Sequence, residues 1–219
     1  RRAIMEALQG VDEWGWDVFR LREAAGGREL QVLGWHLICK WKLDVTFALD
    51  LRALASLLAF VESTYTQSDY HNCTHAADVL QTTHWMLRAA GGAALFSDLE
   101  VLALLVAALA HDVGHDGRTN GFHKETVSGR ALAFNDQSIQ ENLHLWVVFR
   151  RLTSHPGSNP FAAMPRAQFA ELRRLLILTI LNTDMTRHFA GHKSLTSLLE
   201  AHDRAAAAAA AATFSAAAA

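Results

Sequence analysis

The apolar residues of this chain recur every three or four positions along most of its length, which is the period of an α-helix with one buried face. Between these stretches the chain becomes polar or rich in glycine, and no alternation of apolar and polar residues is long enough to indicate a β-strand. The pattern predicts an all-α domain of many short helices, over residues 29–43, a segment that begins at Asp50, 72–86, a segment that begins at Ser97, 125–134, 138–152, 166–182 and 187–200.

One predicted helix has both a marked start and an unusual composition. Ser97 and Glu100 stand in the spacing of a capping box, in which each side chain binds the other residue's backbone N–H. The run from Leu99 to Leu109 is apolar on nearly every side, so this helix is expected to be buried on most of its surface. His111 and Asp112 follow it directly, and we therefore expect them near the middle of the domain. Residues 114–121, with three glycines, are predicted to form a loop.

The composition indicates one compact globular domain, with 219 residues, 51% hydrophobic residues and a net charge of −2. No apolar run is long enough to cross a bilayer, and no signal peptide is evident. No block of lysine and arginine suggests nucleic-acid binding. The two cysteines, Cys39 and Cys73, form no disulfide framework. We expect an intracellular, cytoplasmic protein, with a place in a cytoskeletal or ciliary assembly as a further option.

The end of the chain is almost entirely alanine, over 205–212 and again over 216–219. One interpretation is a true low-complexity helix, since alanine has the highest helix propensity. The other is a run of residues whose identity was not assigned and which were written as alanine. We favour the second, because an all-alanine segment has no apolar face with which to dock. Residues 1–204 are then the first and middle parts of a domain whose C-terminal part is missing, and 205–219 are unassigned sequence.

Two clusters of histidine carry the chemistry of this sequence. His71 and His75 are four residues apart, which on a helix places both on one face. His111 and Asp112 offer a nitrogen and an oxygen ligand side by side, and His115 follows four residues after His111. This set is typical of a metal site, most simply Zn²⁺ alone or Zn²⁺ paired with Mg²⁺ or Mn²⁺. Packing alone explains it poorly, because each buried imidazole or carboxylate without a partner costs a few kcal/mol.

Five ordered motifs extend this pattern along residues 14–188. They are the opening segments 14–19 and 26–34, Tyr70-His71-Asn72 with His75-Ala76-Ala77-Asp78-Val79, His111-Asp112-Val113-Gly114-His115 with Gly117 and Asn120, Phe134-Asn135-Asp136 with Ser138 and Glu141-Asn142-Leu143-His144, and Thr183-Asp184-Met185 with His188. In this order the motifs resemble those of the catalytic domain of class I 3′,5′-cyclic nucleotide phosphodiesterases, a branch of the HD-type metal-dependent phosphohydrolases.

The resemblance implies an enzyme that hydrolyses cAMP, cGMP or both to the 5′-monophosphate. It implies that His75, His111 and Asp112 bind the tightly held metal, Zn²⁺, and that Asp112 also reaches a second ion, Mg²⁺ or Mn²⁺. It gives His71 the role of the general acid that protonates the leaving O3′.

The resemblance also implies roles for residues around these groups. His115, Glu141 and Thr183 would hold the water molecules of the second ion. Asn72 and Asp78 would orient the histidine helix, and Met185 would line the nucleotide pocket.

The chain departs from the family pattern at a few positions. Gly114 stands where the family usually has an acidic residue, Asp116 where it has proline, Leu143 where it has the first histidine of a pair, and Phe134 where it has tyrosine. The family's fourth metal ligand, an aspartate on a later helix, has no counterpart in this chain.

Two alternatives to a phosphodiesterase stay open on the sequence. One is a catalytically impaired, phosphodiesterase-like structural subunit of a larger assembly, since the back half of the domain is missing. The other is an HD-type hydrolase for a different phosphorylated nucleotide. The Tyr-His-Asn motif argues against the second, because a simple HD site has no need of a general acid before His75.

Overall fold

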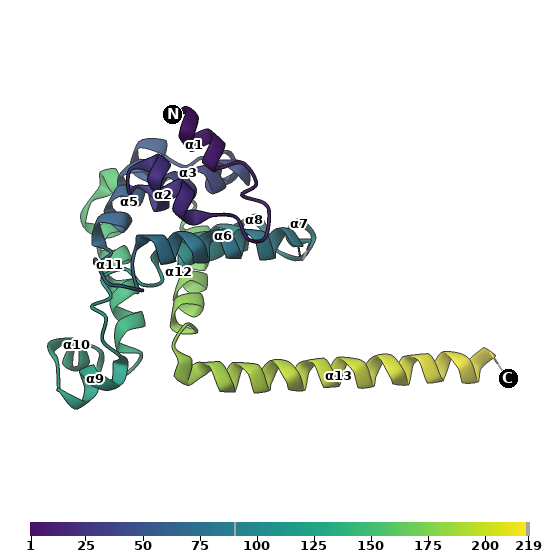
Figure 1. Ribbon diagram of the computed structural model, residues 1–219. Coiled ribbons are helices and arrows are strands. Elements are labelled where there is room, and N and C mark those ends of the chain that lie inside the picture. Colours follow the sequence, from purple (N-terminus) through teal and green to yellow (C-terminus); the bar gives the residue numbers. More distant parts are fainter. Residues whose placement is uncertain (90, 218–219) are drawn as a thin grey trace. The chain divides into compact units, whose positions relative to one another are not determined.

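The computed structural model describes residues 1–89 and 91–217, and within them it contains helices and no strand. The all-α prediction is therefore confirmed. The chain divides into two units, residues 1–181 and a second that begins at Asn182. The helices of the first unit (Figure 1) are α1 Arg2–Ala7, α2 Val18–Ala25, α3 Glu29–Lys40, α4 Leu43–Thr46, α5 Leu51–Thr64, α6 Cys73–Ala89, α7 Gly92–Leu95, α8 Asp98–Ala110, α9 Asn120–Glu125, α10 Gly129–Phe134, α11 Ile139–Ser154, the 3₁₀ turn Pro156–Ser158 and α12 Arg166–Leu181.

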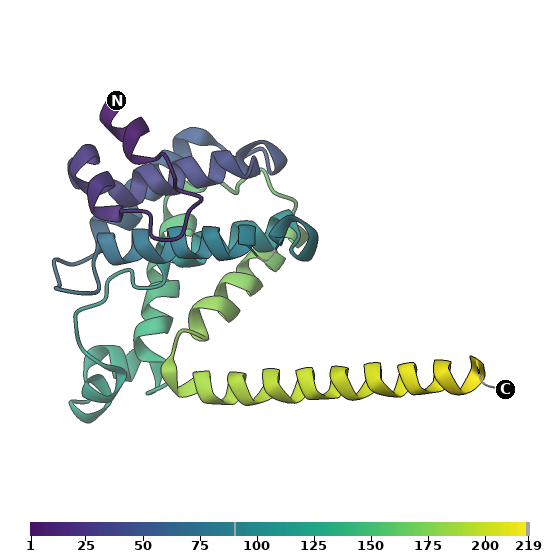
Figure 2. The ribbon, with the colours of Figure 1, turned by 45° about the vertical axis from the view of Figure 1, so that its right-hand side comes forward.

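The second unit is a single long helix, α13 Met185–Ala217, drawn as one continuous rod in Figure 2. Its start is capped by Asp184, whose Oδ1 accepts hydrogen bonds from the backbone N–H and the hydroxyl of Thr186. The helix includes the predicted segment 187–200 and continues through the alanine run, as expected from the high helix propensity of alanine.

The predicted capping signals are confirmed where the sequence showed them. Asp50 accepts hydrogen bonds from the backbone N–H groups of Arg52 and Ala53 and begins α5. Ser97 and Glu100 form both halves of a capping box at the start of α8. Such caps satisfy the first N–H groups of a helix, which have no partner within it.

The prediction of one helix over 125–134 is wrong. The segment contains the end of α9 and all of α10, separated by a turn in which Val127 has a left-handed φ of 48°. Each helix has its own cap, because Thr119 accepts a hydrogen bond from Phe122 N–H and Ser128 accepts one from Ala131 N–H. The predicted loop over 114–121 therefore ends at Thr119, the N-cap of α9, and its last two residues are helical.

Two other predicted helices differ at their ends. The segment 29–43 forms α3 only as far as Lys40, and Lys42, with a left-handed φ of 57°, separates it from α4. The histidine helix begins at Cys73, so His71 precedes the helix and does not share a helical face with His75. The expectation that helical spacing aligns these two histidines is thus wrong.

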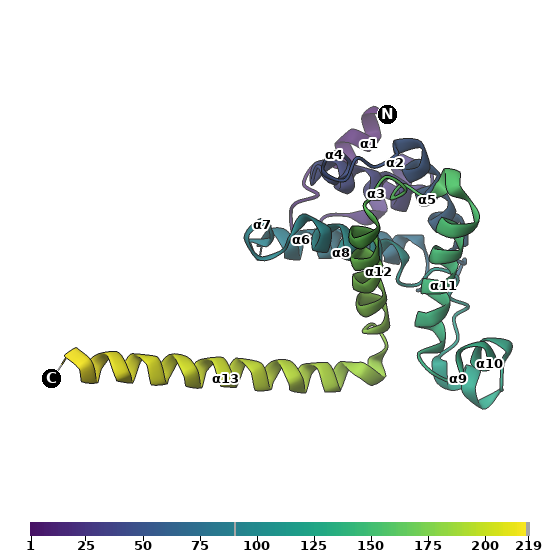
Figure 3. The same ribbon diagram turned by 180° about the vertical axis from the view of Figure 1, so that it is seen from behind.

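Helix α8 lies at the centre of the first unit, and α3, α6 and α12 pack against it (Figures 1 and 3). Its consecutive side chains Val101, Leu102 and Ala103, which point to different sides of the helix, are all buried, as predicted for a helix that is apolar all round. Gly34 of α3 makes this packing close, because a Cβ atom at that position would lie 2.9 Å from a methyl carbon of Leu58 and 2.9 Å from one of Leu109.

We predict that Gly34→Ala lowers the free energy of unfolding by about 1 kcal/mol or more, because overpacking of a core costs ~1–3 kcal/mol and outweighs the gain in helix propensity. The control is Gly121→Ala in α9, where the nearest atom to a new Cβ is 3.7 Å away. This second change should stabilise the protein slightly. Urea unfolding of both variants measures the difference, and equal shifts at the two positions would contradict the packing argument.

Candidate metal centre

Several hydrogen bonds fix the first turn of α6, which carries His75. Asn72 caps the helix, since its Oδ1 accepts hydrogen bonds from the backbone N–H groups of Thr74 and His75. The Thr74 hydroxyl donates to the buried Glu29 carboxylate at 2.8 Å and accepts from an Arg22 guanidinium N–H at 3.3 Å. Helices α2, α3 and α6 thus meet at the residue next to His75.

The end of α8 presents the other two groups of the cluster. His111 is the C-cap residue of α8, and its Nδ1 lies 3.0 Å from the carbonyl oxygen of Ala108. A carbonyl oxygen only accepts, so Nδ1 carries the proton and donates it there. In the neutral imidazole the lone pair is then on Nε2, which faces His75 and Asp112. Tyr65 adds a hydrogen bond from its hydroxyl to the carbonyl of Leu109 at 3.0 Å.

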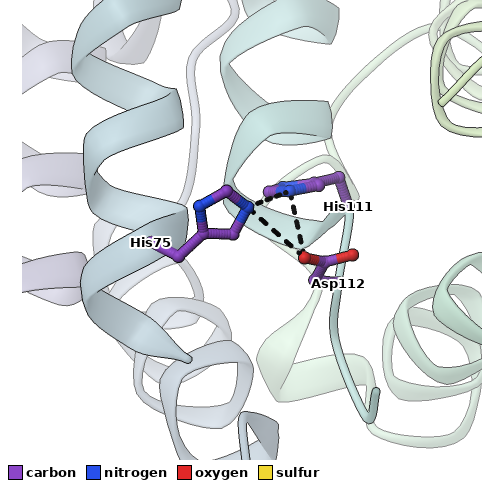
Figure 4. A group of neighbouring side chains, drawn as sticks. All are labelled: His75, His111 and Asp112. Carbon is purple, nitrogen blue, oxygen red and sulfur yellow. Dashed lines mark hydrogen bonds and ion pairs between the residues drawn. The ribbon is translucent and has the colours of Figure 1, made fainter. Parts of the chain in front are cut away.

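His75, His111 and Asp112 form a nearly equilateral triangle of ligand atoms (Figure 4). The His75 Nε2–His111 Nε2 distance is 3.3 Å, the His111 Nε2–Asp112 Oδ2 distance is 3.3 Å, and the His75 Nε2–Asp112 Oδ2 distance is 3.5 Å. Bonds of 2.0–2.1 Å in a tetrahedral zinc site place neighbouring ligand atoms about 3.4 Å apart. The three side chains therefore fit three corners of such a site.

The charges of the triangle are strongly coupled. Burial lowers the pKa of His75, and the neighbouring His111 adds to this effect. Burial also works against protonation of His111, but the hydrogen bond and charge of Asp112 outweigh it, and the pKa of His111 is raised. Burial likewise opposes ionisation of Asp112, yet the hydrogen bond and charge of His111 hold the pKa of that carboxyl well below its usual range. A carboxylate that stays ionised is what a metal ligand requires.

His71 and His115 stack on each other next to this triangle. Their ring centroids are 3.7 Å apart and their planes differ by 14°. His71 precedes α6 and His115 follows α8, so the pairing comes from tertiary structure and not from helical spacing. The ring of His71 also lies 6.4 Å from that of His75, edge to face. All five residues of the two histidine clusters thus come together in space.

His144 belongs to the same group of side chains and was not among the predicted site residues. It is buried on α11, its Nδ1–H donates to the carbonyl of Val113 at 2.7 Å, and its Nε2 lies 3.8 Å from Asp112 Oδ1. Its ring also stacks near that of His115, with centroids 5.9 Å apart. The spacing of Glu141 and His144, three residues on one helix, could have identified the pair because it places both on one face.

The other predicted residues lie at varying distances from the centre. Glu141 is in the first turn of α11, where its carboxylate accepts a hydrogen bond from the Asn120 side chain at 2.9 Å. Asp78 lines a cleft of about 350 Å³ that also contains His75. Thr183 and Met185 belong to the second unit, and their roles stay predictions.

The departure at Gly114 has a backbone explanation. Gly114 has a φ of 76°, a conformation that favours glycine, and its N–H donates to the carbonyl of Thr64. An acidic residue in this conformation would be strained. The glycine therefore lets the chain turn sharply between Asp112 and His115.

Comparison with known proteins gives the family. The family model for 3′5′-cyclic nucleotide phosphodiesterases matches residues 70–216. The chain belongs to the 3′,5′-cyclic nucleotide phosphodiesterase family. It is 36% identical over 200 residues to the human dual specificity calcium/calmodulin-dependent 3′,5′-cyclic nucleotide phosphodiesterase 1C, a match that covers 90% of this chain and 28% of that protein. It is 38% identical over 204 residues to the 1B protein of Bos taurus, covering 92% of this chain and 38% of that one.

A solved structure shows the same fold. The phosphodiesterase domain of the RhoPDE fusion protein from the choanoflagellate Salpingoeca rosetta matches with a TM-score of 0.76 and 32% sequence identity, covering 90% of this chain and 60% of that domain chain. The chain thus spans well under half the length of the two curated relatives, and less than two thirds of the solved domain chain.

The comparisons favour neither of the two alternatives left open by the sequence, which were a structural subunit of a larger assembly and an HD-type hydrolase for another nucleotide. Among the described residues, no helix is both long enough and apolar enough to cross a bilayer.

His144 gives this centre a pH dependence that can be measured. Burial lowers its pKa from 6.5 to about 4, so the folded state favours the neutral ring. The stabilisation is complete above pH 6.5 and is lost as the pH falls from 6.5 towards 4. We predict a loss of about 3 kcal/mol over this range, at ~1.4 kcal/mol per pH unit.

Urea unfolding of the metal-free protein at several pH values tests this expectation. His144→Leu should make the decline between pH 6.5 and 4 less steep than in the wild type, because the other buried histidines remain. His155→Leu, at an exposed position, is the control. Identical slopes for wild type and His144→Leu would rule out this role.

Proposed function

We propose that the protein containing this chain hydrolyses a 3′,5′-cyclic nucleotide, cAMP, cGMP or both, to the 5′-monophosphate. The observation that carries the proposal is the triangle of His75, His111 and Asp112 with the stacked His71–His115 pair beside it, in a chain of this family. A metal site next to a proton donor suits the hydrolysis of a charged phosphodiester, because this reaction depends mainly on positioning the substrate and neutralising its charge.

We propose Zn²⁺ in the triangle and Mg²⁺ or Mn²⁺ at a second position. When bound, these ions would supply a nucleophile at neutral pH and neutralise charge on the phosphate. The orientation of Asp112 supports two separate ion positions. Asp112 directs Oδ2 towards the two histidines of the triangle and Oδ1 towards His144, so its two oxygens can serve different ions. His115, Glu141 and Thr183 are proposed to hold the waters of the second ion.

His71 is proposed as the general acid that gives a proton to O3′ as it leaves. Unlike His75, His71 contributes no atom to the triangle, so its nitrogens are available to substrate. The flat stacking on His115 restricts the ring to one plane, which suits a group that must aim a proton at one atom. Asn72 and Asp78 are proposed to orient α6, and Met185 to line the nucleotide pocket.

The first test separates proton donation from metal binding. In the full-length protein, His71→Ala should lower kcat for cAMP or cGMP by about 10²–10⁴-fold, the usual contribution of general acid catalysis, and leave the zinc content unchanged. Release of the 5′-monophosphate with added Mg²⁺ and elemental analysis of the purified protein measure the two quantities. His155→Ala is the control. A wild-type protein that binds metal and turns over neither nucleotide would refute the proposed activity.

The second test addresses the triangle without an activity measurement. His75→Ala should reduce zinc affinity by several orders of magnitude, because it removes one of three ligands, while the exposed His155→Ala should not change it. Competition with a chromogenic chelator gives both dissociation constants. Unchanged zinc affinity in His75→Ala would exclude this residue as a ligand.

A further inference from the structure

Asp116, which stands where the family pattern has proline, is the centre of a polar network. Its Oδ1 lies 2.7 Å from Gln140 Nε2, 3.2 Å from His123 Nε2 and 3.2 Å from the backbone nitrogen of Arg118, and its Oδ2 lies 3.3 Å from Arg130 Nη1. His123 is on α9, Arg130 on α10 and Gln140 on α11. One carboxylate therefore connects the loop after His115 to three helices, and Figure 1 shows α9 and α10 beside the lower end of α11.

The network is closed, so it acts as one rigid unit. The Gln140 amide also donates to the carbonyl of Arg118 at 2.9 Å, and its oxygen accepts from Arg130 at 2.8 Å. The Asp116 carboxylate only accepts, so His123 Nε2 carries the proton and donates it at 3.2 Å, and the Ser128 hydroxyl donates to His123 Nδ1 at 2.9 Å. His123 and Gln140 are buried, and a buried polar network with every partner present fixes one conformation.

The turn that contains Asp116 also contacts the stacked pair of His71 and His115. In the turn that Asp116 begins, the backbone N–H of Gly117 donates to His115 Nδ1 at 2.9 Å. An N–H donor at Nδ1 leaves the proton of the neutral His115 ring on Nε2. The turn therefore sets both the tautomer and the plane of the ring against which His71 stacks.

A second chain of hydrogen bonds, through Asn120, leads to Glu141. The side-chain oxygen of Asn120 accepts from the backbone N–H of Gln140 at 2.9 Å, and its amide donates to the Glu141 carboxylate at 2.9 Å. The first turn of α11 is thus tied to the start of α9 next to the Asp116 network.

We propose that Asp116 is a positioning residue for the reaction, which fixes the turn at 115–118 and through it the orientation of His115 and His71. The inference rests on the proposed function, since it assigns the benefit to proton donation by His71. A proline would restrict the same turn by its ring, whereas here four polar contacts to one carboxylate restrict it.

The test compares two substrates that differ in their need for a general acid. A cyclic nucleotide expels an alkoxide that must be protonated, whereas bis(4-nitrophenyl) phosphate expels a nitrophenolate that leaves without a proton. In the full-length protein, Asp116→Ala should lower kcat for the cyclic nucleotide by about 10–100-fold, as for other misplaced catalytic groups, with KM nearly unchanged. Its effect on the nitrophenyl substrate should be about threefold or less.

Asp116→Asn keeps the Oδ1 acceptor and should restore most of the activity relative to the alanine variant. If the alanine variant does not fold, Asp116→Glu, which keeps the charge but displaces the acceptor, takes its place and should show the same selective loss on the cyclic nucleotide. His71→Ala is the positive control and should show the same selectivity for the cyclic nucleotide. Equal losses on both substrates, or no loss on either, would overturn the inference.

A spectroscopic measurement separates this inference from the proposed function. In ¹⁵N-labelled protein, the His115 imidazole should show a protonated Nε2, and Asp116→Ala should shift or broaden this signal while Arg2→Ala does not. If wild type turns over neither substrate, the proposed function fails, and the ¹⁵N signal alone decides whether Asp116 orients His115. An unchanged signal in Asp116→Ala overturns the positioning role.

Discussion

The approach of the first turn of α6 to the last turn of α8 brings together three groups that repel one another unless a cation lies between them. Two imidazole lone pairs and a carboxylate oxygen lie 3.3–3.5 Å apart in a partly buried place. In the metal-free chain a proton reduces this repulsion, which is why the pKa of His111 is raised and that of Asp112 is lowered. A divalent ion would replace that proton with a larger charge, so metal binding and protonation should compete at this site.

The rest of the first unit can be understood as the support that holds these two helix ends together. Gly34 allows α3 to pack closely against the leucine that lies two residues before His111. Asn72 and the Glu29–Thr74 hydrogen bond fix the turn that carries His75. Because the ligands sit on helix ends whose caps and packing are independent of a metal, little rearrangement is needed when one binds, and preorganised ligands bind more tightly.

The sequence predicted those parts of this arrangement that local rules govern. Helical periodicity and caps at Asp50 and Ser97 located the helices, and the histidine clusters included the three residues that the structure brings together as a candidate metal centre. The i, i+4 spacing of His71 and His75 was misleading, because Asn72 caps the helix and leaves His71 before it, as the predicted range 72–86 already implied. His144 lies in a quoted motif three residues after Glu141, but its approach to Asp112 depends on the packing of α11 against the end of α8, which spacing alone does not give.

The region from Asp116 to Ser138 shows why the remaining features were beyond sequence rules. Four non-glycine residues adopt left-handed backbone conformations here, namely Val127, Asn135, Asp136 and Ser138. Asn and Asp tolerate this conformation, but a β-branched valine adopts it at a cost of the order of 1–3 kcal/mol. Such strain persists only where surrounding contacts over-determine the backbone. The hydrogen bonds and the ion pair of Asp116 hold residues of α9, α10 and α11, the helices on either side of these turns. The backbone of this region thus follows from hydrogen bonds between residues far apart in the sequence, which local sequence rules do not predict.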